Sequence, residues 1–477
     1  MCPRVKQGRQ AAGRFARMPS PAAAIGKKYE ALAAQFVKEH RLPGAAVGVV
    51  HEGSLVWSKG IGFADVAKRR AASPQGLYRI ASITKTFTAA LVMQLRDEGK
   101  LTLDDPVVQY LPELKKVKSA FGPVEGVTLR RLLSHESGLQ SEPPGTDWSL
   151  VRYENEAAKN LARAKEIATT VPPNSQWKYS NLGYQLLGEV VARVSGGSYK
   201  VALMKRLLTP LRMSATGLDP VPARLRARQA IGYEPRFLSD ELEPAPKEDA
   251  KIFTAEGGLW SCVEDLQRWL SCQFTGKAPG GKVLLAEETL AEMHKPRYIV
   301  DDAWTRAWAI GWYAVRKDDV IWRMHSGGHY GFITNACFEP EEKVGAITLL
   351  NGFANATALN LELAAAAREA VREAAPKVEA PKPLPEEWRD LVGIYLTPHW
   401  GSITRIEWRD GKLTVIDPDD ATWKPTLAPT DEPDVFRIEK GYRESGELVR
   451  FQRDEKGRVV AVVMAVATME RLEPVGS

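Results

Sequence analysis

Apolar residues follow helical spacing in some stretches of the chain and form short strand-like runs in others. Residues 28–40 are predicted to form a helix, and residues 84–98 form a second one, with apolar positions recurring at helical spacing. Between them, two apolar runs at 45–50 and 54–58 are separated by a three-residue turn ending in glycine, which indicates a β-hairpin. The chain therefore begins with a helix, a hairpin and another helix.

The middle of the chain, residues 101–272, has helical patches separated by turn clusters. Strand-like runs then return, and an alanine-rich helix is predicted over 358–374. The runs cover 307–315, 320–324, 332–338 and 344–350. This order predicts an α/β domain with a single sheet whose edges come from both ends of the domain, with the helical region inserted between them.

A proline-rich stretch and a change of pattern mark a second domain. Residues 375–386 hold four prolines among charged residues, which is typical of a semi-rigid linker. Beyond it, short strand-like runs recur about every ten residues, as in a small antiparallel barrel or sandwich. The runs cover 391–396, 403–408, 413–416, 435–438, 448–452 and 459–467. The expected domains are a basic flexible tail at 1–27, a main domain at 28–374, the linker, and an all-β domain at 387–477.

The composition narrows the classes of protein that the chain can belong to. It has 477 residues, of which 44% are hydrophobic and 26% charged. These fractions are typical of globular proteins, and at roughly 100 to 200 residues per domain the length predicts two or three domains. A wholly disordered chain, a collagen-like fibre and a small disulfide scaffold are excluded.

The positive charge of the chain is concentrated at one end. The net charge is +6, but seven basic residues and no acidic one fall within the first 29 positions, so the remainder is close to neutral. A protein that binds nucleic acid is expected to carry its basic residues on a folded face. We therefore expect no nucleic-acid partner, and a flexible tail.

No stretch of 18 apolar residues exists, and the start lacks the apolar region of a secretory signal, so no membrane association and a cytoplasmic location are expected. The basic, acid-free N-terminal segment could also be a transit peptide, or the true start of the protein could be Met18, and the sequence does not distinguish these alternatives. The four cysteines show no metal-ligand spacing, which predicts reduced thiols and no bound metal or cofactor.

Ser82 and Lys85 carry the first candidate chemistry. Three residues apart on a helix, the two side chains lie on one face, about 5 to 6 Å apart at Cβ. Serine is a weak nucleophile that needs a base, and a lysine that loses its proton through desolvation can act as one or relay the proton. The same S-x-x-K spelling at Ser175 and Lys178 follows a Pro-Pro loop and is interpreted as a turn.

A second element follows at Tyr179-Ser180-Asn181. A phenol can serve as a base if nearby cations stabilise the phenolate, and an amide two residues on can bind both the lysine and a substrate amide or ester. The similar spelling at Tyr153-Glu154-Asn155 lies in a charged stretch and is interpreted as an exposed helix face.

The third element is a glycine-rich segment, His325-Ser326-Gly327-Gly328, directly after a predicted strand. Glycine lets the backbone approach a ligand closely, and an extended edge can offer an N–H to an oxyanion. His329, four residues after His325, is interpreted as structural.

These three elements, in this order, resemble the serine β-lactamase and penicillin-binding-protein superfamily. The resemblance is greatest to the branch with class C β-lactamases, family VIII carboxylesterases and D-aminopeptidases, and covers about residues 30–370. It implies a β-lactamase-like antiparallel sheet flanked by helices with an inserted helical subdomain. The segment at 387–477 is similar to the lipocalin-like barrel appended to some peptidase-type members.

The resemblance also implies a role for each candidate residue. Ser82 would be acylated, Lys85 would be its activating partner, and Tyr179 would be the base. Asn181, His325, Gly327 and Gly328 would contact substrate, and the oxyanion would bind the backbone N–H groups of Ser82 and Gly328. His325 stands where many members have a lysine, which replaces a carboxylate-binding cation with a titratable group.

The expected function is therefore hydrolysis of small carboxylic esters through an acyl-enzyme on Ser82, with weak or no β-lactam hydrolysis. The alternatives are a peptidase or amidohydrolase acting on D-residues, a β-lactamase, and a penicillin-binding or scaffold protein without turnover. A small-molecule ester or amide is the expected partner. The barrel is expected to cap the active site, to mediate homo-oligomerisation, or to act only as a stabilising appendage.

Two further features of the sequence bear on the candidate site. His135 suggests a Ser-His-Asp triad, but its surroundings fit a helix end and no G-x-S-x-G motif is present to pair with it. Three tryptophans at a spacing of four, Trp304, Trp308 and Trp312, would form one stripe if helical. Core packing is expected for them, with one of them as a wall of an acyl pocket as the alternative.

Overall fold

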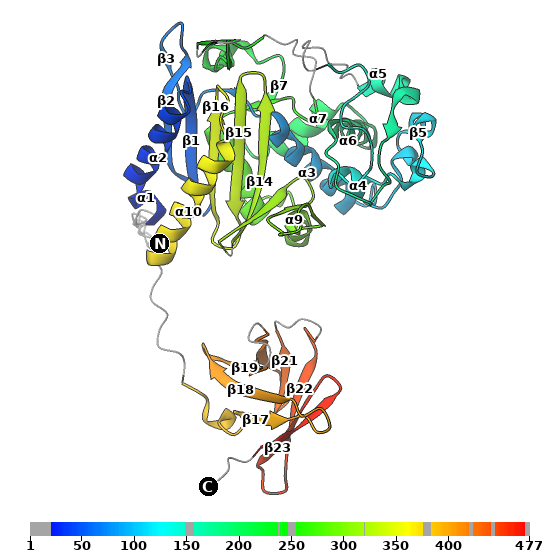
Figure 1. Ribbon diagram of the computed structural model, residues 1–477, viewed down its shortest axis with the longest axis vertical. Helices are drawn as coiled ribbons and strands as arrows, with labels where there is room; N and C mark the ends of the chain where they lie inside the picture. Colours follow the sequence, from blue (N-terminus) through cyan, green and yellow to red (C-terminus); the bar gives the residue numbers. More distant parts are fainter. Residues whose placement is uncertain are drawn as a thin grey trace, which may run out of the picture. The chain divides into compact units, whose positions relative to one another are not determined.

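The computed structural model describes residues 21–147, 157–236, 239, 241–246, 254–318, 320–374, 383–418, 423–439 and 444–472. The chain divides into two compact units, Met1–Ala374 and Ala375–Ser477 (Figure 1). Most of the expected basic tail and linker, and the motif-like Tyr153-Glu154-Asn155, lie outside the described residues.

One antiparallel sheet forms the centre of the first unit. Its strands are β1 (Gly44–His51), β2 (Ser54–Asp65), β3 (Arg70–Ala71), β11 (Tyr298–Ile299), β12 (Arg306–Trp308), β13 (Tyr313–Lys317), β14 (Val320–His329), β15 (Phe332–Glu339) and β16 (Val344–Leu350). Their order across the sheet is β11-β12-β13-β14-β15-β16-β1-β2-β3. β1 pairs with β16, with Ala45 opposite Leu350, so strands from both ends of the unit form one sheet, as the sequence predicts.

The two faces of the sheet are covered by different helices. Ala45, Val47 and Val49 of β1 share a buried cluster with α2 (Gly26–Glu39) and α10 (Ala356–Ala374). Alternate residues of β1 join a second cluster with α8 (Val263–Thr275). Figure 1 shows α10 lying over β15 and β16. This alternation is the period-2 pattern of a strand buried on both faces.

The inserted helical region lies between β3 and β11 in the chain. Its remaining described elements are β4 (Tyr78–Arg79), η1 (Ala81–Ile83), α3 (Thr84–Asp97), η2 (Val107–Gln109), η3 (Pro112–Lys116), β5 (Lys118–Ser119), η4 (Val124–Gly126), α4 (Leu129–Leu133), α5 (Ala157–Ala162), η6 (Ala164–Glu166), β6 (Ala168–Thr169), α6 (Asn181–Val194), α7 (Tyr199–Leu203), η7 (Met204–Leu208), β7 (Gly217–Leu218), η8 (Ala223–Arg228), β8 (Tyr233–Pro235), β9 (Leu242–Pro244), β10 (Leu259–Ser261) and α9 (Glu287–His294). A short α1 (Pro21–Ala24) precedes α2.

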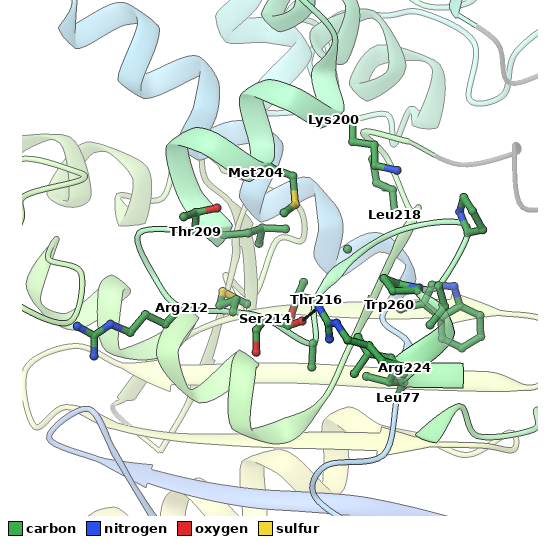
Figure 2. Close-up of a pocket in the computed structure, with 18 residues that line it drawn as sticks. Leu77, Lys200, Met204, Thr209, Arg212, Ser214, Thr216, Leu218, Arg224 and Trp260 are labelled. Atoms are coloured by element: carbon green, nitrogen blue, oxygen red, sulfur yellow. Dashed lines mark hydrogen bonds between the residues drawn. The ribbon is translucent and has the colours of Figure 1, made fainter. Parts of the chain in front are cut away.

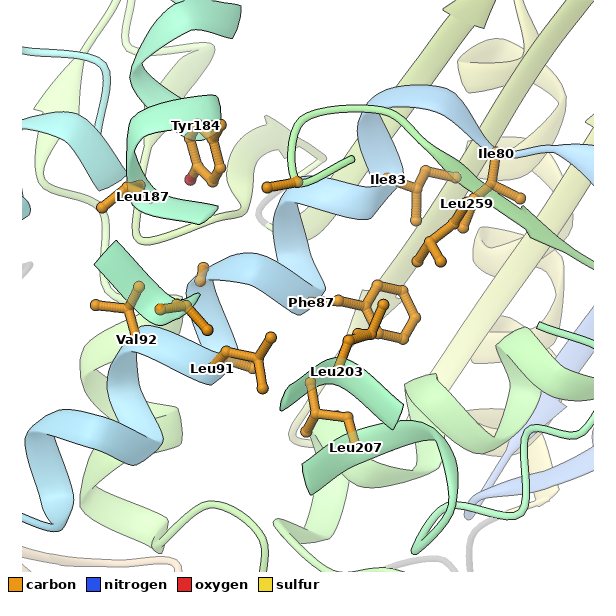
Figure 3. Close-up of a cluster of buried hydrophobic side chains, with 14 of the residues drawn as sticks. Ile80, Ile83, Phe87, Leu91, Val92, Tyr184, Leu187, Leu203, Leu207 and Leu259 are labelled. Atoms are coloured by element: carbon orange, nitrogen blue, oxygen red, sulfur yellow. The ribbon is translucent and has the colours of Figure 1, made fainter. Parts of the chain in front are cut away.

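Helix α3, which begins two residues after Ser82, is buried over most of its length. Every residue from Thr84 to Leu95 is buried. Figure 3 shows Phe87 and Leu91 of this helix beside apolar side chains of α6, α7 and η7. A helix enclosed on all sides holds its first turn away from water, so a charged side chain placed there loses hydration.

Strand β14 passes very close to the segment that precedes α3. A Cβ atom built on Gly327 would lie 2.1 Å from the carbonyl oxygen of Ile80 and 2.6 Å from Oγ1 of Thr334. The Thr334 hydroxyl donates to the same Ile80 oxygen at 3.1 Å. Only glycine fits at position 327, and this approach brings β14 beside η1.

The structure corrects two expectations about strands. The expected single strand over 307–315 is two strands, β12 and β13, separated by a turn in which Gly311 has φ 75° and the Ala309 N–H donates to the Trp312 oxygen. The three tryptophans therefore lie on no common helix. The histidine-glycine segment belongs to β14 itself, because its pairing with β15 continues through His329.

The second unit is a closed antiparallel barrel of eight strands. They are β17 (Gly393–Leu396), β18 (Ile403–Arg409), β19 (Lys412–Ile416), β20 (Thr426–Pro429), β21 (Val435–Ile438), β22 (Leu448–Arg453), β23 (Val459–Met464) and β24 (Ala467–Arg471), after a short turn η9 (Glu386–Trp388). Apolar side chains such as Tyr395, Phe436 and Val462 fill its core. Sequence patterns missed β20 and merged β23 with β24, whose joining turn contains Ala465 at φ 53°.

Within the described residues, no helix combines the length and apolarity that crossing a bilayer requires. Cys262, Cys272 and Cys337 are free and buried.

We expect Gly327→Ala to destabilise the first unit by about 1 to 3 kcal/mol, because overpacking forces β14 away from the Ile80 carbonyl. Gly328→Ala is the matched control, since a Cβ there would approach only Ile333 Cδ1, at 3.5 Å. Thermal unfolding of both variants measures the difference. Equal unfolding temperatures would contradict the claim that this contact fixes β14.

Candidate active site

Three side chains from separate parts of the sequence meet at Ser82. Lys85 Nζ lies 3.0 Å from Ser82 Oγ, and the Tyr179 hydroxyl donates to the same Oγ at 2.9 Å. Ser82 lies in η1 and Lys85 in the first turn of α3, while Tyr179 lies directly before α6. A nucleophile, an amine and a phenol thus form one continuous hydrogen-bonded group.

The turn that holds Ser82 is tight. Ser82 belongs to a 3-10 turn and not to the α-helix itself, but the one-turn spacing to Lys85 is kept. Ala81, the residue before it, has φ 45°, a left-handed conformation that costs an L-residue roughly 1 to 2 kcal/mol. The surrounding contacts, including the close approach of β14, hold this strained turn in place.

The surroundings of Lys85 Nζ match those of a neutral amine. Nζ lies 2.7 Å from Asn181 Oδ1 and 2.7 Å from the backbone oxygen of Glu256. These two oxygens can only accept, whereas the Ser82 hydroxyl can also donate. An uncharged amine would give its two N–H groups to Asn181 and Glu256 and would direct its lone pair at the Ser82 proton.

Burial favours this uncharged form. Lys85 is 0% exposed, and desolvation lowers its pKa below the ordinary value of 10.5. The negative charges of Glu256 and Glu142 oppose the shift by raising the pKa. Desolvation is the largest cause, so Lys85 can accept a proton at a lower pH than an exposed lysine can.

Glu142 fixes the orientation of the Asn181 amide. Asn181 Nδ2 donates to Glu142 Oε1 at 2.7 Å, which turns Oδ1 of the same amide toward Lys85. The residue after Tyr179, Ser180, caps α6 by accepting from the Gly183 N–H. Asn181 is thus held at the beginning of a helix with both ends of its amide engaged, and its main contact in this structure is with the lysine.

Glu256 is a buried acid next to the lysine that the sequence motifs did not single out. Its side chain is 1% exposed, and its Oε1 accepts from Gln185 Nε2 at 2.7 Å. Oε2 has no hydrogen-bond partner within the described ranges. Burial raises the pKa of this carboxyl, opposed mainly by the Gln185 hydrogen bond. The only sequence signal is its place directly before Gly257-Gly258.

His135 holds Tyr179 in place. Its ring stacks on the Tyr179 ring with centroids 4.3 Å apart. Its Nδ1 accepts from the Ser180 N–H at 3.1 Å, and its backbone oxygen accepts from the Lys178 N–H at 2.8 Å. Burial lowers the pKa of His135 well below its ordinary value, so it is neutral. His135 is therefore a positioning residue, which agrees with rejecting a Ser-His-Asp triad.

The phenol of Tyr179 stays protonated at neutral pH. Burial raises the pKa of Tyr179 above its ordinary value, and the Ser82 hydrogen bond opposes this only in part. Lys85 Nζ lies 5.0 Å from the centre of the ring. The raised pKa of Tyr179 disfavours its expected role as an ionised base. Lys85 is therefore the better group to accept the Ser82 proton first.

His325 is also neutral. Its Nδ1 lies 2.6 Å from the Ser326 carbonyl oxygen, which can only accept, so Nδ1 carries the proton. Its Nε2 has no hydrogen-bond partner in the described part of the chain. Burial, followed by the charge of Lys85, lowers the pKa of His325 to about 3. His325 therefore supplies no positive charge to the site.

A cavity of about 730 Å³, here called the Ser82 pocket, opens onto these groups. Ser82, Tyr179, His325 and Gly328 line it, whereas Gly327 is occupied by its contact with Ile80. Most of the remaining wall is apolar or aromatic, and charged residues lie at Arg306, Lys317 and Glu362. The apolar wall includes Trp177, Val300, Trp308, Tyr313, Val315 and Leu361.

Other candidates from the sequence lie apart from this group. The Ser175 hydroxyl donates to the Pro172 oxygen, and Lys178 Nζ donates to Ser141 Oγ, so the second S-x-x-K pair is not joined. Trp312 is buried in the core, as expected, while Trp308 lines the Ser82 pocket. His329 lines a different cavity.

In the part of the chain that the structure describes, no cluster of three or more His, Cys, Asp or Glu side chains could hold a metal ion.

Comparisons with known proteins found a matching family model and several relatives. Residues 29–370 match the family model described as Beta-lactamase. Penicillin-binding protein 4 of Amycolatopsis lactamdurans is 30% identical over 377 residues, which cover 75% of this chain and 94% of that protein.

Protein flp of Staphylococcus aureus strain N315 is 28% identical over 320 residues, or 66% of this chain. This chain spans 61% of the length of protein flp. Among solved structures, the octameric penicillin-binding protein homologue from Pyrococcus abyssi superposes with a TM-score of 0.63 at 23% identity, over 93% of this chain and 99% of that chain. At this identity the likeness concerns the fold alone.

We expect a fluorophosphonate probe to label the protein at Ser82, because Lys85 and Tyr179 together activate that hydroxyl. Ser82→Ala should abolish labelling, and Ser175→Ala should leave it unchanged. In-gel fluorescence followed by peptide mass spectrometry measures both. Equal labelling of the Ser82→Ala protein would overturn the assignment of the nucleophile.

Proposed function

Since this chain belongs to the Beta-lactamase family, we propose that it is a serine hydrolase in which Ser82 takes the acyl group of a small carboxylic ester and passes it to water. One observation supports this most directly: Lys85 Nζ faces two oxygens that can only accept and the Ser82 hydroxyl. A buried amine in this position is already uncharged, so it can accept the serine proton without first releasing a proton of its own to solvent.

In the acylation step, Ser82 Oγ attacks the ester carbonyl carbon while its proton moves to Lys85. The oxyanion that forms would be stabilised by the backbone N–H groups of Ser82 and Gly328. Gly328 lies in β14, beside the turn that holds Ser82. Stabilisation of this kind commonly contributes roughly 10² to 10³ in rate per donor.

The Tyr179 hydroxyl then protonates the leaving oxygen as the C–O bond breaks. The resulting Tyr179 phenolate is reprotonated by the proton that Lys85 took from Ser82, so Lys85 and Tyr179 both return to their starting states. In deacylation, water attacks the acyl carbonyl, its proton moves to Lys85, and Ser82 Oγ leaves with a proton from the same amine. Protons balance over the cycle, and an alcohol and a carboxylic acid are released.

The groups around Ser82 favour an uncharged substrate with an apolar or aromatic acyl group, since the two basic residues of the pocket wall, Arg306 and Lys317, form no hydrogen bond with Ser82 in the described residues. His325 is neutral and buried, so it offers no cation to a substrate carboxylate next to Ser82. The aromatic rings of Trp177, Trp308 and Tyr313 provide apolar contact area. A small aliphatic or aromatic ester fits this environment better than a β-lactam, which carries a carboxylate.

Other activities of the same site stay as alternatives: hydrolysis of D-amino-acid amides or peptides, β-lactam hydrolysis, and penicillin binding without turnover. Self-association of the chain is likewise a prediction.

We expect kcat/KM for p-nitrophenyl butyrate and benzoate to exceed kcat/KM for a chromogenic cephalosporin by about 10- to 100-fold, the loss that a missing charged hydrogen bond produces. D- and L-amino acid p-nitroanilides complete the panel, and the Ser82→Ala protein is the blank. Faster hydrolysis of a D-residue anilide than of either ester would favour the amidohydrolase. A lasting penicillin adduct in the intact mass, with no ester turnover, would identify a binding protein.

The pH dependence tests the role of Lys85. Its neutral form is the proton acceptor, so kcat/KM for an ester should rise with pH through the lowered pKa of Lys85, below 10.5. The charge of Glu256 raises this pKa, so Glu256→Gln should lower it and move the rise of kcat/KM to lower pH.

Glu287→Gln, on the exposed beginning of α9, is the control and should leave the pH profile in place. A rise that moves to higher pH in the Glu256→Gln protein would contradict the assignment of Lys85 as the proton acceptor.

A further inference from the structure

A second cavity, of about 380 Å³, lies apart from the Ser82 pocket and shares no lining residue with it. Its walls come from α7, from the π-helical turn η7, from residues 209–222 and from η8 (Figure 2). Leu77 and Trp260 also line it. We call this cavity the Trp260 pocket. It is separate from the chemistry proposed above.

The interior of the Trp260 pocket is apolar. The side chains of Leu208, Leu218, Val221 and Leu225 are all less than a tenth exposed, as is the Trp260 ring. A cavity of this size is at the lower end of the roughly 300 to 1,000 Å³ that small-molecule sites occupy. The pocket can therefore hold an apolar group of a ligand and shield that group from water.

The pocket wall beside Trp260 is fixed before any ligand arrives. The indole Nε1 donates to Asp219 Oδ1 at 2.7 Å, and the Arg79 guanidinium lies 4.5 Å from the centre of the indole ring. Arg79 also forms a buried ion pair with Asp219 at 2.8 Å. The Asp219 carboxylate is thus already paired and does not neutralise the cations of the rim.

Three exposed cations line this pocket, and among the described residues no acidic side chain does. They are Lys200 on α7, Arg212 after η7, and Arg224 on η8, and Figure 2 draws each of them. Within the described ranges, none of the three forms an ion pair. Among the described residues, Arg224 donates one long hydrogen bond, of 3.5 Å, to the Ser214 oxygen. The rim therefore carries uncompensated positive charge above an apolar interior.

We propose that the Trp260 pocket binds an amphipathic carboxylate, with its aliphatic chain in the apolar interior and its carboxylate at the cationic rim. Charge complementarity selects an anionic head group, since a neutral or cationic amphiphile would leave the rim cations unpaired or repel them. Burial of the chain supplies most of the affinity, because exposed ion pairs contribute little individually.

Gly217 offers a way to fill the pocket without disturbing its walls. It lines the cavity, a Cβ built on it meets no atom within 4 Å, and its backbone is not left-handed. Gly197 has the same open surroundings but lies away from the Trp260 pocket, which makes Gly197→Phe a matched control for Gly217→Phe.

The experiment is calorimetric titration of the full chain with decanoate, decanol, decyltrimethylammonium and acetate. Decanoate should bind with one site per chain, decanol and acetate more weakly, and the cation not at all. Gly217→Phe should abolish decanoate binding, and Gly197→Phe should retain it. Removal of two rim cations, in the double variant with Arg212→Ala and Arg224→Ala, should weaken binding about tenfold, the sum of two exposed ion pairs.

Arg306→Ala, at the Ser82 pocket, separates the two cavities and should leave decanoate binding unchanged. Decanoate that binds equally well to wild type and to the Gly217→Phe and double variants would overturn the proposal. So would decanoate binding that only Arg306→Ala removes, which would assign the ligand to the Ser82 pocket. The double variant, exposed at both positions, keeps the test valid if Gly217→Phe does not fold.

Discussion

The burial of a single amine, that of Lys85, is the constraint on which the candidate site depends. Lys85, in the first turn of α3, has no solvent-exposed surface, because every residue of that helix from Thr84 to Leu95 is buried. Desolvation at this place is what lowers the lysine pKa, and the two carbonyl-type oxygens beside Nζ leave its lone pair directed at Ser82. The large helical region thus acts on the chemistry by excluding solvent.

Much of this arrangement was accessible from the sequence, because it depends on local spacing. Helical periodicity located α3, and one-turn spacing paired Ser82 with Lys85. Alternating apolar runs located most strands, and the change of pattern after the proline-rich stretch indicated an all-β barrel. The turn at Gly311 and the continuation of β14 through His329 were missed, since pairing between strands, and not composition, sets where those strands end.

The roles that the sequence did not reveal belong to residues that act over long separations in the chain. His135 stacks on Tyr179, Glu142 orients Asn181, and Glu256 lies beside Lys85. Their effects are on orientation and charge, which leave no periodic signature. The sequence predicted His325 as a departure from lysine, but its burial, which lowers its pKa to about 3 and favours the neutral form, appears only in the structure. The difference matters, because it changes which substrates the pocket favours.

The most direct measurement is the titration of Lys85 itself, by NMR of Cε and Nζ in isotopically labelled lysine, with the Lys85→Arg protein used to assign its signal. We expect Lys85 to titrate well below 10.5, since desolvation is the largest cause that shifts its pKa. If the NMR signal shows that the Lys85 amine stays charged up to the ordinary pKa of lysine, the claim that burial makes this amine the proton acceptor for Ser82 would be contradicted.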